Sequence, residues 1–221
     1  MADNNFRISH TLTDEISDIL RERILSGEYG IGEKIKEAAV ADELKVSRTP
    51  IREAFKNLQK EGLIEYIPNR GCFARGFTKR DIDDIYDIRK ALEILTIKWA
   101  IEGISDKEID ELKKQCQMMR NYASKHENQK ALKVNPVFHD VIYRAAGSRF
   151  MTRVLHSYKD YITDTREAIF YDDEYLAQVI EEHEAILKAI EKRDVEMATA
   201  AMADHLDRSK KRASALYLKA E

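Results

Sequence analysis

Three histidines and one asparagine in the second half of the chain have the surroundings expected of metal ligands. Asn135 and His139 are four residues apart, so they share one face of a helix. His183 and His205 each stand among apolar residues, which directs their rings towards a core. Imidazole nitrogens and an amide oxygen are suitable ligands for Zn²⁺ or Ni²⁺. The four residues therefore predict a divalent metal site, although each histidine alone also fits a hydrogen-bonded core residue.

A second group of residues is basic and lies in the first half of the chain. Residues 45–60 carry five Lys and Arg side chains against a single acid, although the net charge of the chain is −3. On a helix, Arg52 and Lys56 project from one face while the apolar Ile51 and Phe55 form another. The total charge argues against a surface that attracts nucleic acid everywhere, whereas the cluster predicts a local DNA-binding site.

The types of these residues indicate how the basic cluster would contact DNA. Arg48 and Arg52 have forked donors that suit guanine edges or phosphates. Ser47 and Thr49, at the start of the helix, are placed to hold a phosphate through their hydroxyls and nearby backbone amides. The full set of predicted DNA-contacting residues is Ser47, Arg48, Thr49, Arg52, Lys56, Arg70 and Gly71.

The elements that would position the basic cluster are three helices and a hairpin. Apolar periodicity predicts helices near 11–26 and 36–44, with a glycine-punctuated turn between them, and a third helix with Pro50 in its first turn. Residues 63–67 alternate as a strand does, and 72–75 can return as its partner after a turn. Three helices followed by a β-hairpin form a winged helix-turn-helix, whose glycine-containing tip can approach DNA closely.

The rest of the chain predicts helices alone. Thr78 and Ser105 each precede an acid by three residues, which is the spacing of an N-terminal capping box. The predicted helices lie near 79–102, 106–125, 129–146, 149–170, 173–191 and 194–217. The expected fold class is therefore mainly α, with a winged helix-turn-helix domain at residues 1–77 and an all-helical bundle domain at 78–221.

The composition fits a soluble protein built from amphipathic helices, with 43% hydrophobic and 35% charged residues. No apolar run reaches the roughly 18 residues needed to cross a bilayer, and the N-terminus lacks the features of a secretory signal. We therefore expect a cytoplasmic protein without membrane contact. Cys72 and Cys116 lack CxxC spacing, so we expect reduced, structural thiols.

Two stretches of the chain resemble known families. The DNA-binding domain of the GntR superfamily is similar to KVSRTPIREAFKNLQKEGLIEYIPNRGCFAR, in which SRTPxREA, LxxEGL and PxRG follow in order at the family's spacing. That family's link between its first two helices resembles ILSGEYGIGEKIKE, with Ile31 where proline is common. From about residue 79 the chain resembles the FCD ligand-binding domain of the FadR-like branch, through DIYDIRKALE, FHDVIYRAAGS, EEHEAILKAIEKRD and MADHL. Together the two resemblances cover nearly the whole chain.

The FCD resemblance implies roles for the polar residues of the second domain. In that family the ion helps to hold a carboxylate effector, and the ligand at the position of Asn135 is typically Asp or Asn. An asparagine adds no negative charge, so it should hold a dication more weakly than an aspartate would. The resemblance also implies that Arg89 grips the effector carboxylate through its forked guanidinium. The alternative for Arg89 is a surface salt bridge with Asp87 or Glu93.

Together these features predict a ligand-responsive transcription regulator of the bacterial cytoplasm, associated with the nucleoid through DNA, with repression as the expected mode. It would act as a homodimer on a roughly palindromic double-stranded operator and respond to a small organic acid, held with a zinc, nickel or similar ion. Catalysis is not expected. A metalloenzyme is one alternative, but His183 and Glu184 begin an HExxH motif that Leu187 breaks. The other alternative is an architectural DNA-binding protein without a sensor.

Overall fold

The computed structural model describes residues 11–76, 78–167 and 172–217. Contacts between residues divide the chain into two compact units, Met1–Phe77 and Thr78–Glu221. The first unit combines helices with a small sheet, and the second is helical wherever it has regular structure in its described part. The predicted fold class, a winged helix-turn-helix followed by an all-helical domain, is therefore confirmed.

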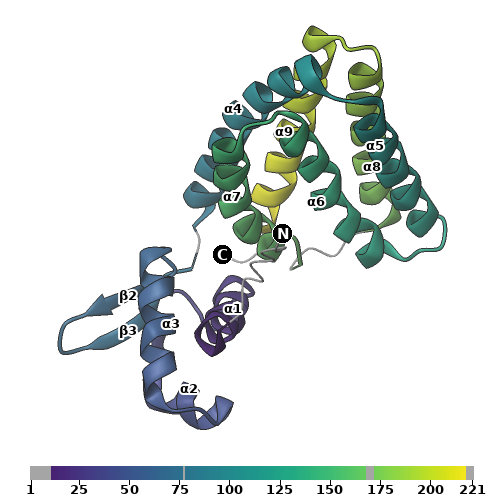
Figure 1. The fold of residues 1–221 in the computed structure, drawn as a ribbon. Coiled ribbons are helices and arrows are strands. Elements are labelled where there is room, and N and C mark those ends of the chain that lie inside the picture. Colours follow the sequence, from purple (N-terminus) through teal and green to yellow (C-terminus); the bar gives the residue numbers. More distant parts are fainter. Residues whose placement is uncertain (1–10, 77, 168–171, 218–221) are drawn as a thin grey trace, which may run out of the picture. The chain divides into compact units, whose positions relative to one another are not determined.

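The first unit contains three helices and a three-stranded antiparallel sheet (Figure 1). The helices are α1 (Leu12–Leu25), α2 (Glu37–Leu44) and α3 (Arg48–Lys60), and the strands are β1 (Lys34–Ile35), β2 (Ile64–Ile67) and β3 (Gly71–Ala74). The strand order is β1-β3-β2, so β3 pairs with both of the others. The predicted helices and hairpin are present. The glycine-punctuated turn, however, also contains β1, whose two residues form a strand only by pairing with β3.

An apolar core fixes the orientation of α3. Leu20 of α1 and Ile51 and Leu58 of α3 are completely shielded from solvent. α1 begins at a capping box, in which the Thr11 hydroxyl accepts from the backbone N–H of Asp14 and the Asp14 carboxylate accepts from the backbone N–H of Thr11. Truncating a fully buried leucine to alanine costs about 2–5 kcal/mol, so these contacts hold α3 firmly against α1.

The turn between α2 and α3 sets the start of α3. Lys45 ends α2 in the left-handed region, with φ of 53°, and Ser47 occupies the N-cap of α3 in an extended conformation. Pro50 lies in the first turn of α3, where its missing N–H costs no helical hydrogen bond. A short turn between two helices of this kind is the arrangement of a helix-turn-helix.

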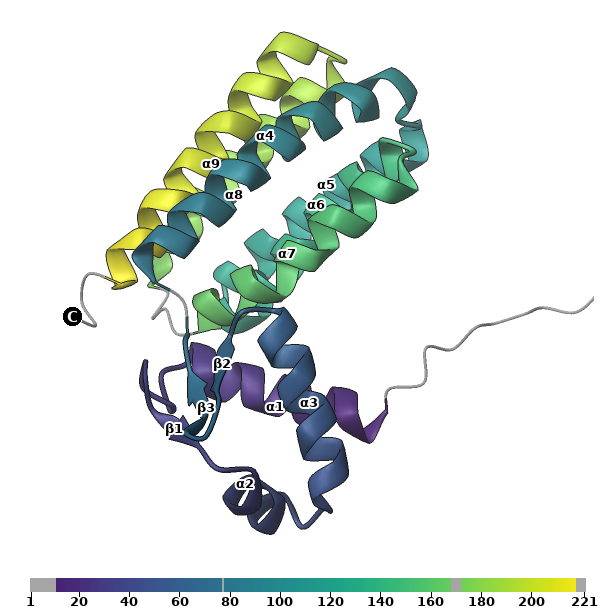
Figure 2. The ribbon, with the colours of Figure 1, turned by 90° about the vertical axis from the view of Figure 1, so that its left-hand side faces the viewer.

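The second unit contains six helices in its described part (Figure 2). They are α4 (Lys79–Gly103), α5 (Asp106–Ala123), α6 (Asn128–Ala145), α7 (Arg149–Glu167), α8 (Asp173–Glu191) and α9 (Val195–Tyr217). α4 and α5 begin at the predicted capping boxes, with Thr78 and Ser105 as the caps. α4 packs along α9, α9 along α8, and α5 against α6 and α8. Within the described ranges, no helix is both long and apolar enough to cross a membrane.

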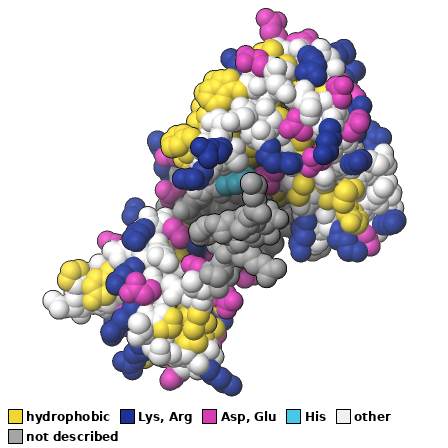
Figure 3. Space-filling view, viewed as in Figure 1, with side chains coloured by type: hydrophobic (Ala, Val, Ile, Leu, Met, Phe, Trp, Pro, Cys, Tyr) yellow, Lys and Arg dark blue, Asp and Glu magenta, His cyan; other side chains and the backbone are white. Residues whose placement is uncertain are grey.

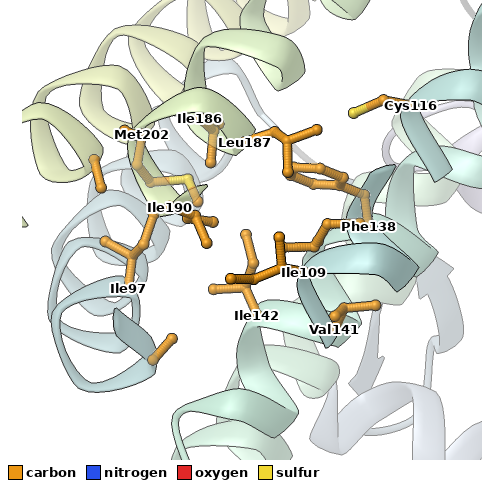
Figure 4. Close-up of a cluster of buried hydrophobic side chains, with 14 of the residues drawn as sticks. Ile97, Ile109, Cys116, Phe138, Val141, Ile142, Ile186, Leu187, Ile190 and Met202 are labelled. Carbon is orange, nitrogen blue, oxygen red and sulfur yellow. The ribbon is translucent and has the colours of Figure 1, made fainter. Parts of the chain in front are cut away.

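Most of the core of the second unit is apolar (Figure 4). Ile97 of α4, Phe138 of α6 and Ile190 of α8 are among its fully buried members. The unit also buries several polar and charged side chains, namely Arg89, Glu93, Thr96, Asn135, His139, Glu182, His183, His205 and Ser209. A buried polar group is costly unless it is hydrogen-bonded. These residues therefore mark the candidate functional site of the second unit.

Pro136 lies inside α6, between Asn135 and His139. Proline has no backbone N–H, so the helix lacks the hydrogen bond that would join this position to the carbonyl of Leu132. α6 nevertheless continues as one helix on both sides of the proline. The local loss of a hydrogen bond thus falls next to a predicted metal ligand.

Both cysteines should be unreactive while the protein is folded. Cys72 in β3 and Cys116 in α5 are buried, and burial raises the pKa of their thiols to about 11 and about 12. Near pH 8, about one thiol in a thousand or fewer would be in the reactive thiolate form. We expect slow labelling by a maleimide in the native state and rapid labelling of both thiols after denaturation with guanidinium. Rapid labelling of the folded protein would contradict the burial of these residues.

Candidate DNA-binding surface and metal centre

One face of α3 is exposed and basic. Arg52 and Lys56, four residues apart, have side chains that are 60% and 64% exposed. Ser47 is the N-cap residue, and Arg48 and Thr49 form the start of the first turn, so three exposed residues surround the N-terminus of the helix. The other face of α3 is buried in the core. The five residues predicted on this helix therefore all lie at the surface.

The N-terminus of α3 is suited to an anion. The first N–H groups of a helix have no partner within the helix, and the helix dipole adds partial positive charge there. The first turn of α3 carries Arg48 and no acidic residue. A phosphate of the DNA backbone could therefore bind to the backbone amides, with the hydroxyls of Ser47 and Thr49 and the Arg48 guanidinium as further donors.

Exposed ion pairs hold the other basic side chains of α3. Nε of Arg52 lies 2.8 Å from Oε2 of Glu37 on α2, and Nζ of Lys56 lies 2.8 Å from Oε1 of Glu53. The hydrogen bond to Glu37 raises the pKa of the Arg52 guanidinium. Exposed ion pairs contribute only about 0–1 kcal/mol, so a phosphate can replace either carboxylate at little cost. Sequence reasoning missed Glu37, because the contact joins two different helices.

The hairpin of β2 and β3 forms the wing. Its turn contains Asn69, with φ of 62°, and β3 begins at Gly71, with φ of 105°, so both residues have a positive φ. A side chain at Gly71 would be strained by this positive φ, and its Cβ atom would also lie 3.0 Å from Cε of Lys34, whose flexible side chain would have to move. Arg70 and Lys34 lie over the Phe73 ring, 5.7 and 5.9 Å from its centroid. Lys34 thus joins the predicted Arg70 at the wing, a position that follows from the pairing of β1 with β3.

In the second unit, three of the predicted metal ligands come together from three helices. His139 of α6, His183 of α8 and His205 of α9, here called the histidine cluster, are 3%, 0% and 0% exposed. Each offers a ring nitrogen, and these nitrogens all lie within 4.8 Å of one another. The centroid of the His139 ring lies 5.4 Å from that of His183 and 5.2 Å from that of His205, and the His183 and His205 centroids are 4.7 Å apart. Three imidazoles at this spacing can share one metal ion.

Contacts at Nδ1 orient all three rings. His139 Nδ1 lies 2.7 Å from Oε2 of Glu93, and His205 Nδ1 lies 2.8 Å from Oε2 of Glu182. His183 Nδ1 donates to a backbone carbonyl one turn earlier in α8, at 2.7 Å. Histidines that bind metals usually donate their second N–H to a carboxylate or carbonyl in this way, which fixes the tautomer. The arrangement leaves Nε2 of each ring as the candidate ligand atom.

The chemistry of these donors fits a divalent ion. Nε2 of His183 and Oδ1 of Asn135 are fully buried and have no hydrogen-bond partner among the described residues. Burial, together with the neighbouring His205 and His139, lowers the pKa of His183 well below its ordinary value. The ring of His183 is therefore neutral, which is the form that binds a metal. Asn135 precedes His139 by one helical turn on α6, as the sequence predicts.

Arg89 of α4 is buried and not at the surface. It is 5% exposed, and its Nε donates to Oε1 of Glu93, whose other oxygen contacts His139. Nη1 of Arg89 is also buried, and it has no hydrogen-bond partner within the part of the chain that is described. The sequence suggested a surface salt bridge with Asp87 or Glu93 as the alternative for Arg89. Glu93 is indeed the partner, but the pair is buried in the core and does not lie at the surface. Nη1 of Arg89 is therefore a buried donor that could bind a ligand inside the second unit.

Glu93 links Arg89 to the histidine cluster. Its side chain is fully buried, which alone would raise its pKa, but the charge of Arg89 and the hydrogen bond from His139 hold the pKa below its ordinary value. Burial and the negative charge of Glu93 raise the pKa of the neighbouring Tyr143 hydroxyl. Glu93 is therefore ionised in the core, because Arg89 and its hydrogen-bond donors favour the charged form.

Glu182 plays the same part for His205. It is 5% exposed, contacts His205 Nδ1, and accepts two hydrogen bonds from Arg212 at 2.8 Å each. Sequence reasoning missed both Glu182 and Arg212. The preceding residue, Glu181, is also a glutamate and is exposed, so residue type alone does not separate the two acids. Only their positions relative to the apolar face of α8 distinguish them.

Loss of the Glu93 carboxylate should destabilise the protein strongly. Glu93→Ala leaves Arg89 charged and buried without its partner, and we expect the free energy of unfolding to fall by about 3–5 kcal/mol. Glu184→Ala is a control that removes a more exposed pair with Arg120 and should cost less than about 1 kcal/mol. Urea unfolding followed by circular dichroism measures both values. Similar small losses in the two variants would argue against a buried ion pair at Glu93.

Two protein families match this chain. Residues 84–208 match the FCD domain, and residues 12–74 match the bacterial regulatory proteins of the gntR family. The FCD match alone covers more than half of the chain. The matched families, and the relatives described next, consist of transcription regulators and not of enzymes.

Similar proteins and structures agree with these matches. The uncharacterized HTH-type transcriptional regulator YdhC of Bacillus subtilis is 29% identical over 81% of this chain and 80% of that protein. The gluconate operon transcriptional repressor of Bacillus licheniformis is 26% identical over 85% of this chain and 79% of its own. The solved structure of E. coli McbR/YncC has a TM-score of 0.72 at 21% identity, over 94% of this chain and 99% of that one. The chain therefore belongs to the GntR family of bacterial transcription regulators, with an FCD domain in its second half.

Proposed function

We propose that this regulator represses transcription from a roughly palindromic double-stranded DNA operator and responds to a small organic acid. Residues 1–77 bind the DNA, and residues 78–221 bind the effector and join two chains in a homodimer. The observation that carries the proposal is the exposed basic face of α3, opposite its buried apolar face. Repression is supported by relatives named as repressors, among them the gluconate operon repressors of two Bacillus species and RspR of E. coli K12.

The geometry of the first unit supports α3 as the helix that reads bases in the major groove. Arg52 leaves the exposed side of α3 and has the fork that pairs with O6 and N7 of guanine. The donors at the N-terminus of α3 can hold a phosphate, which would fix the position of the helix on the duplex. Arg70 and Lys34 add positive charge at the wing, where the DNA backbone or the minor groove can be contacted.

Substitution of the arginines of α3 tests DNA binding directly. Arg48→Ala and Arg52→Ala should each weaken operator binding by about 5- to 150-fold, because one specific guanidinium contact contributes about 1–3 kcal/mol. Fluorescence anisotropy measures the Kd, with duplexes that the wild-type protein selects from a random pool as the probe. Lys60→Ala, exposed at the other end of α3, is the matched control and should bind nearly as well as the wild type. The proposal fails if all three variants bind alike.

The polar site of the second unit supports a carboxylate as the effector. A zinc, nickel or similar ion held by Asn135 and the histidine cluster would supply a positive centre for an anionic group. Nη1 of Arg89 is buried and has no partner in the described structure, so it offers a second donor for a carboxylate. None of the four candidate ligands carries a negative charge. The site therefore favours an anionic effector that balances the charge of the ion.

Metal and effector binding should both appear as added stability. Zn²⁺ or Ni²⁺ should raise the Tm of the metal-free protein, and a small carboxylate such as citrate should raise it further when the ion is present, because ligands of the folded state stabilise it. His183→Ala should abolish the response to metal. His126→Ala removes an exposed histidine that pairs with Asp173 and should keep the response. If the metal raised the Tm of both variants equally in a thermal-shift assay, the proposed metal site would be wrong.

The same acids distinguish a sensor from an architectural DNA-binding protein. A carboxylate that raises the Tm should also change the Kd for operator DNA, since an effector acts by binding one arrangement of the protein more tightly than another. An architectural protein would bind DNA with little sequence preference and without regard to small acids. If none of the acids that raise the Tm changed the Kd for operator DNA, the architectural alternative would be favoured.

A further inference from the structure

A second polar site of the helical unit lies on its surface, at the corner between α6 and α7. It is a pocket of about 490 Å³, within the range of about 300–1,000 Å³ that is usual for small-molecule sites. We call it the arginine pocket, and the lining residues that can contact a ligand are Arg144, Ser148, Arg149, Thr152, Arg153 and His156. None of the described residues that line it is acidic. The pocket is therefore a candidate site for an anion.

Positive charge collects in the arginine pocket, although the whole chain has a net charge of −3. Arg149 and Arg153 are exposed and form no ion pair within the described ranges of the chain. Nη2 of Arg144 lies 2.7 Å from Oε1 of Glu111, in an exposed pair that another anion can replace at little cost. Figure 3 shows Lys and Arg side chains on the face of the second unit where α6 and α7 lie. Like charges held close together repel one another, so a bound anion would relieve this repulsion.

The corner that carries these side chains is held by backbone contacts. Residues 146–148 alone separate α6 from α7. Gly147 has φ of 70°, in the left-handed region, which reverses the direction of the chain within this short turn. The Thr152 hydroxyl donates to the backbone carbonyl of Tyr143 at 3.2 Å and so joins α7 to α6. The arginines of both helices are therefore gathered at one place before a ligand arrives, which lowers the entropic cost of binding.

The arginine pocket supplies hydrogen-bond donors as well as charge. Oγ of Ser148 accepts from the backbone N–H of Met151 at 3.2 Å, so the hydroxyl proton of Ser148 can be donated to a ligand. The first turn of α7 contains no acidic residue that would oppose an anion. Forked guanidinium groups and a hydroxyl match the oxygen atoms of a phosphate group in number and geometry.

Tyr143 separates the arginine pocket from the histidine cluster. Its side chain is buried, and the centroid of its ring lies 6.1 Å from that of His156, which lines the pocket. The same ring lies 6.1 Å from the ring of His139, on the side of the histidine cluster. None of the four candidate metal ligands is among the described residues that line the pocket. A ligand of the arginine pocket would therefore lie outside the candidate metal centre.

We propose that the arginine pocket binds a phosphorylated small molecule through its phosphate group, as a second ligand site of this protein. A phosphate ester carries a charge of about −1.5 to −2 near neutral pH and offers three acceptor oxygens. Three arginines match this charge better than they match the single charge of a monocarboxylate. Free inorganic phosphate has the same chemistry, but an ester would also fill the rest of the pocket. The inference goes beyond the proposed function, because neither the operator nor the organic acid requires these residues.

Calorimetric titration of the full chain tests the arginine pocket. Inorganic phosphate and glucose 6-phosphate should both bind more tightly than acetate, in a buffer of low salt without added metal. Arg144→Ala and Arg153→Ala should each raise the Kd for both phosphates about tenfold or more, because each removes a charge-assisted contact. Arg120→Ala is the matched control, since Arg120 pairs with Glu184 at the surface as Arg144 pairs with Glu111. It should bind the phosphates as the wild type does.

Two further variants locate the bound phosphate. His183→Ala removes a candidate metal ligand, and Arg52→Ala removes a candidate DNA contact. Both should keep the affinity of the wild type for the phosphates, because neither residue lines the arginine pocket. Loss of phosphate binding in His183→Ala would place the anion at the metal centre, and loss in Arg52→Ala would place it on the DNA-binding surface. Either result would overturn the inference, and circular dichroism verifies that the variants are folded.

The outcomes separate this inference from the proposed function. Tighter binding of glucose 6-phosphate than of inorganic phosphate would support an ester as the ligand, and the reverse order would support free phosphate at the same site. The inference is wrong if neither phosphate binds at millimolar concentration, if acetate binds as tightly, or if Arg153→Ala and Arg120→Ala have equal Kd values. Phosphate binding that depends on the arginine pocket, in a protein that binds no selected DNA, would leave the inference intact and contradict the proposed function.

Discussion

The architecture of the second unit depends on two buried carboxylates that hold histidines at Nδ1. Glu93 contacts His139, and Glu182 contacts His205. Imidazoles in an apolar core are stable only when their polar atoms have partners. Each carboxylate needs a cation in turn, which Arg89 and Arg212 supply. Arginine, glutamate and histidine thus alternate on both sides of the histidine cluster, and the packed core around them keeps the helices that carry these residues together.

The first unit places its polar chemistry outside its core. Ile51 and Leu58 pack the buried face of α3 into the core and so fix the position of the helix. The basic residues on its exposed face therefore need no buried partner. The ion pair between Arg52 and Glu37 is largely exposed to water and can be exchanged. The pair between Arg89 and Glu93 is buried and cannot be exchanged without a large cost. The two units therefore use charge in opposite ways, one for contact with a partner and the other for internal order.

Signals carried by neighbouring residues made most of the fold predictable. Apolar periodicity and the capping residues Thr78 and Ser105 indicated every described helix, whereas β1 exists only through its pairing with a distant strand. The histidine cluster was predictable because apolar neighbours on three helices directed the rings inwards. The burial of Arg89 with Glu93 was not, because α4 carries many charged residues and the packed helices around it decide which of them are enclosed. The DNA contacts, the metal and the effector remain predictions.

α4 has 25 residues, so it is a rod roughly 37 Å long. Arg89 and Glu93 lie near its middle, and its N-cap residue, Thr78, is the first residue of the second compact unit. Arg89 and Glu93 lie 10 and 14 residues after Lys79, the first residue of α4. One unbroken helix therefore spans the stretch between the histidine cluster and the start of the second unit.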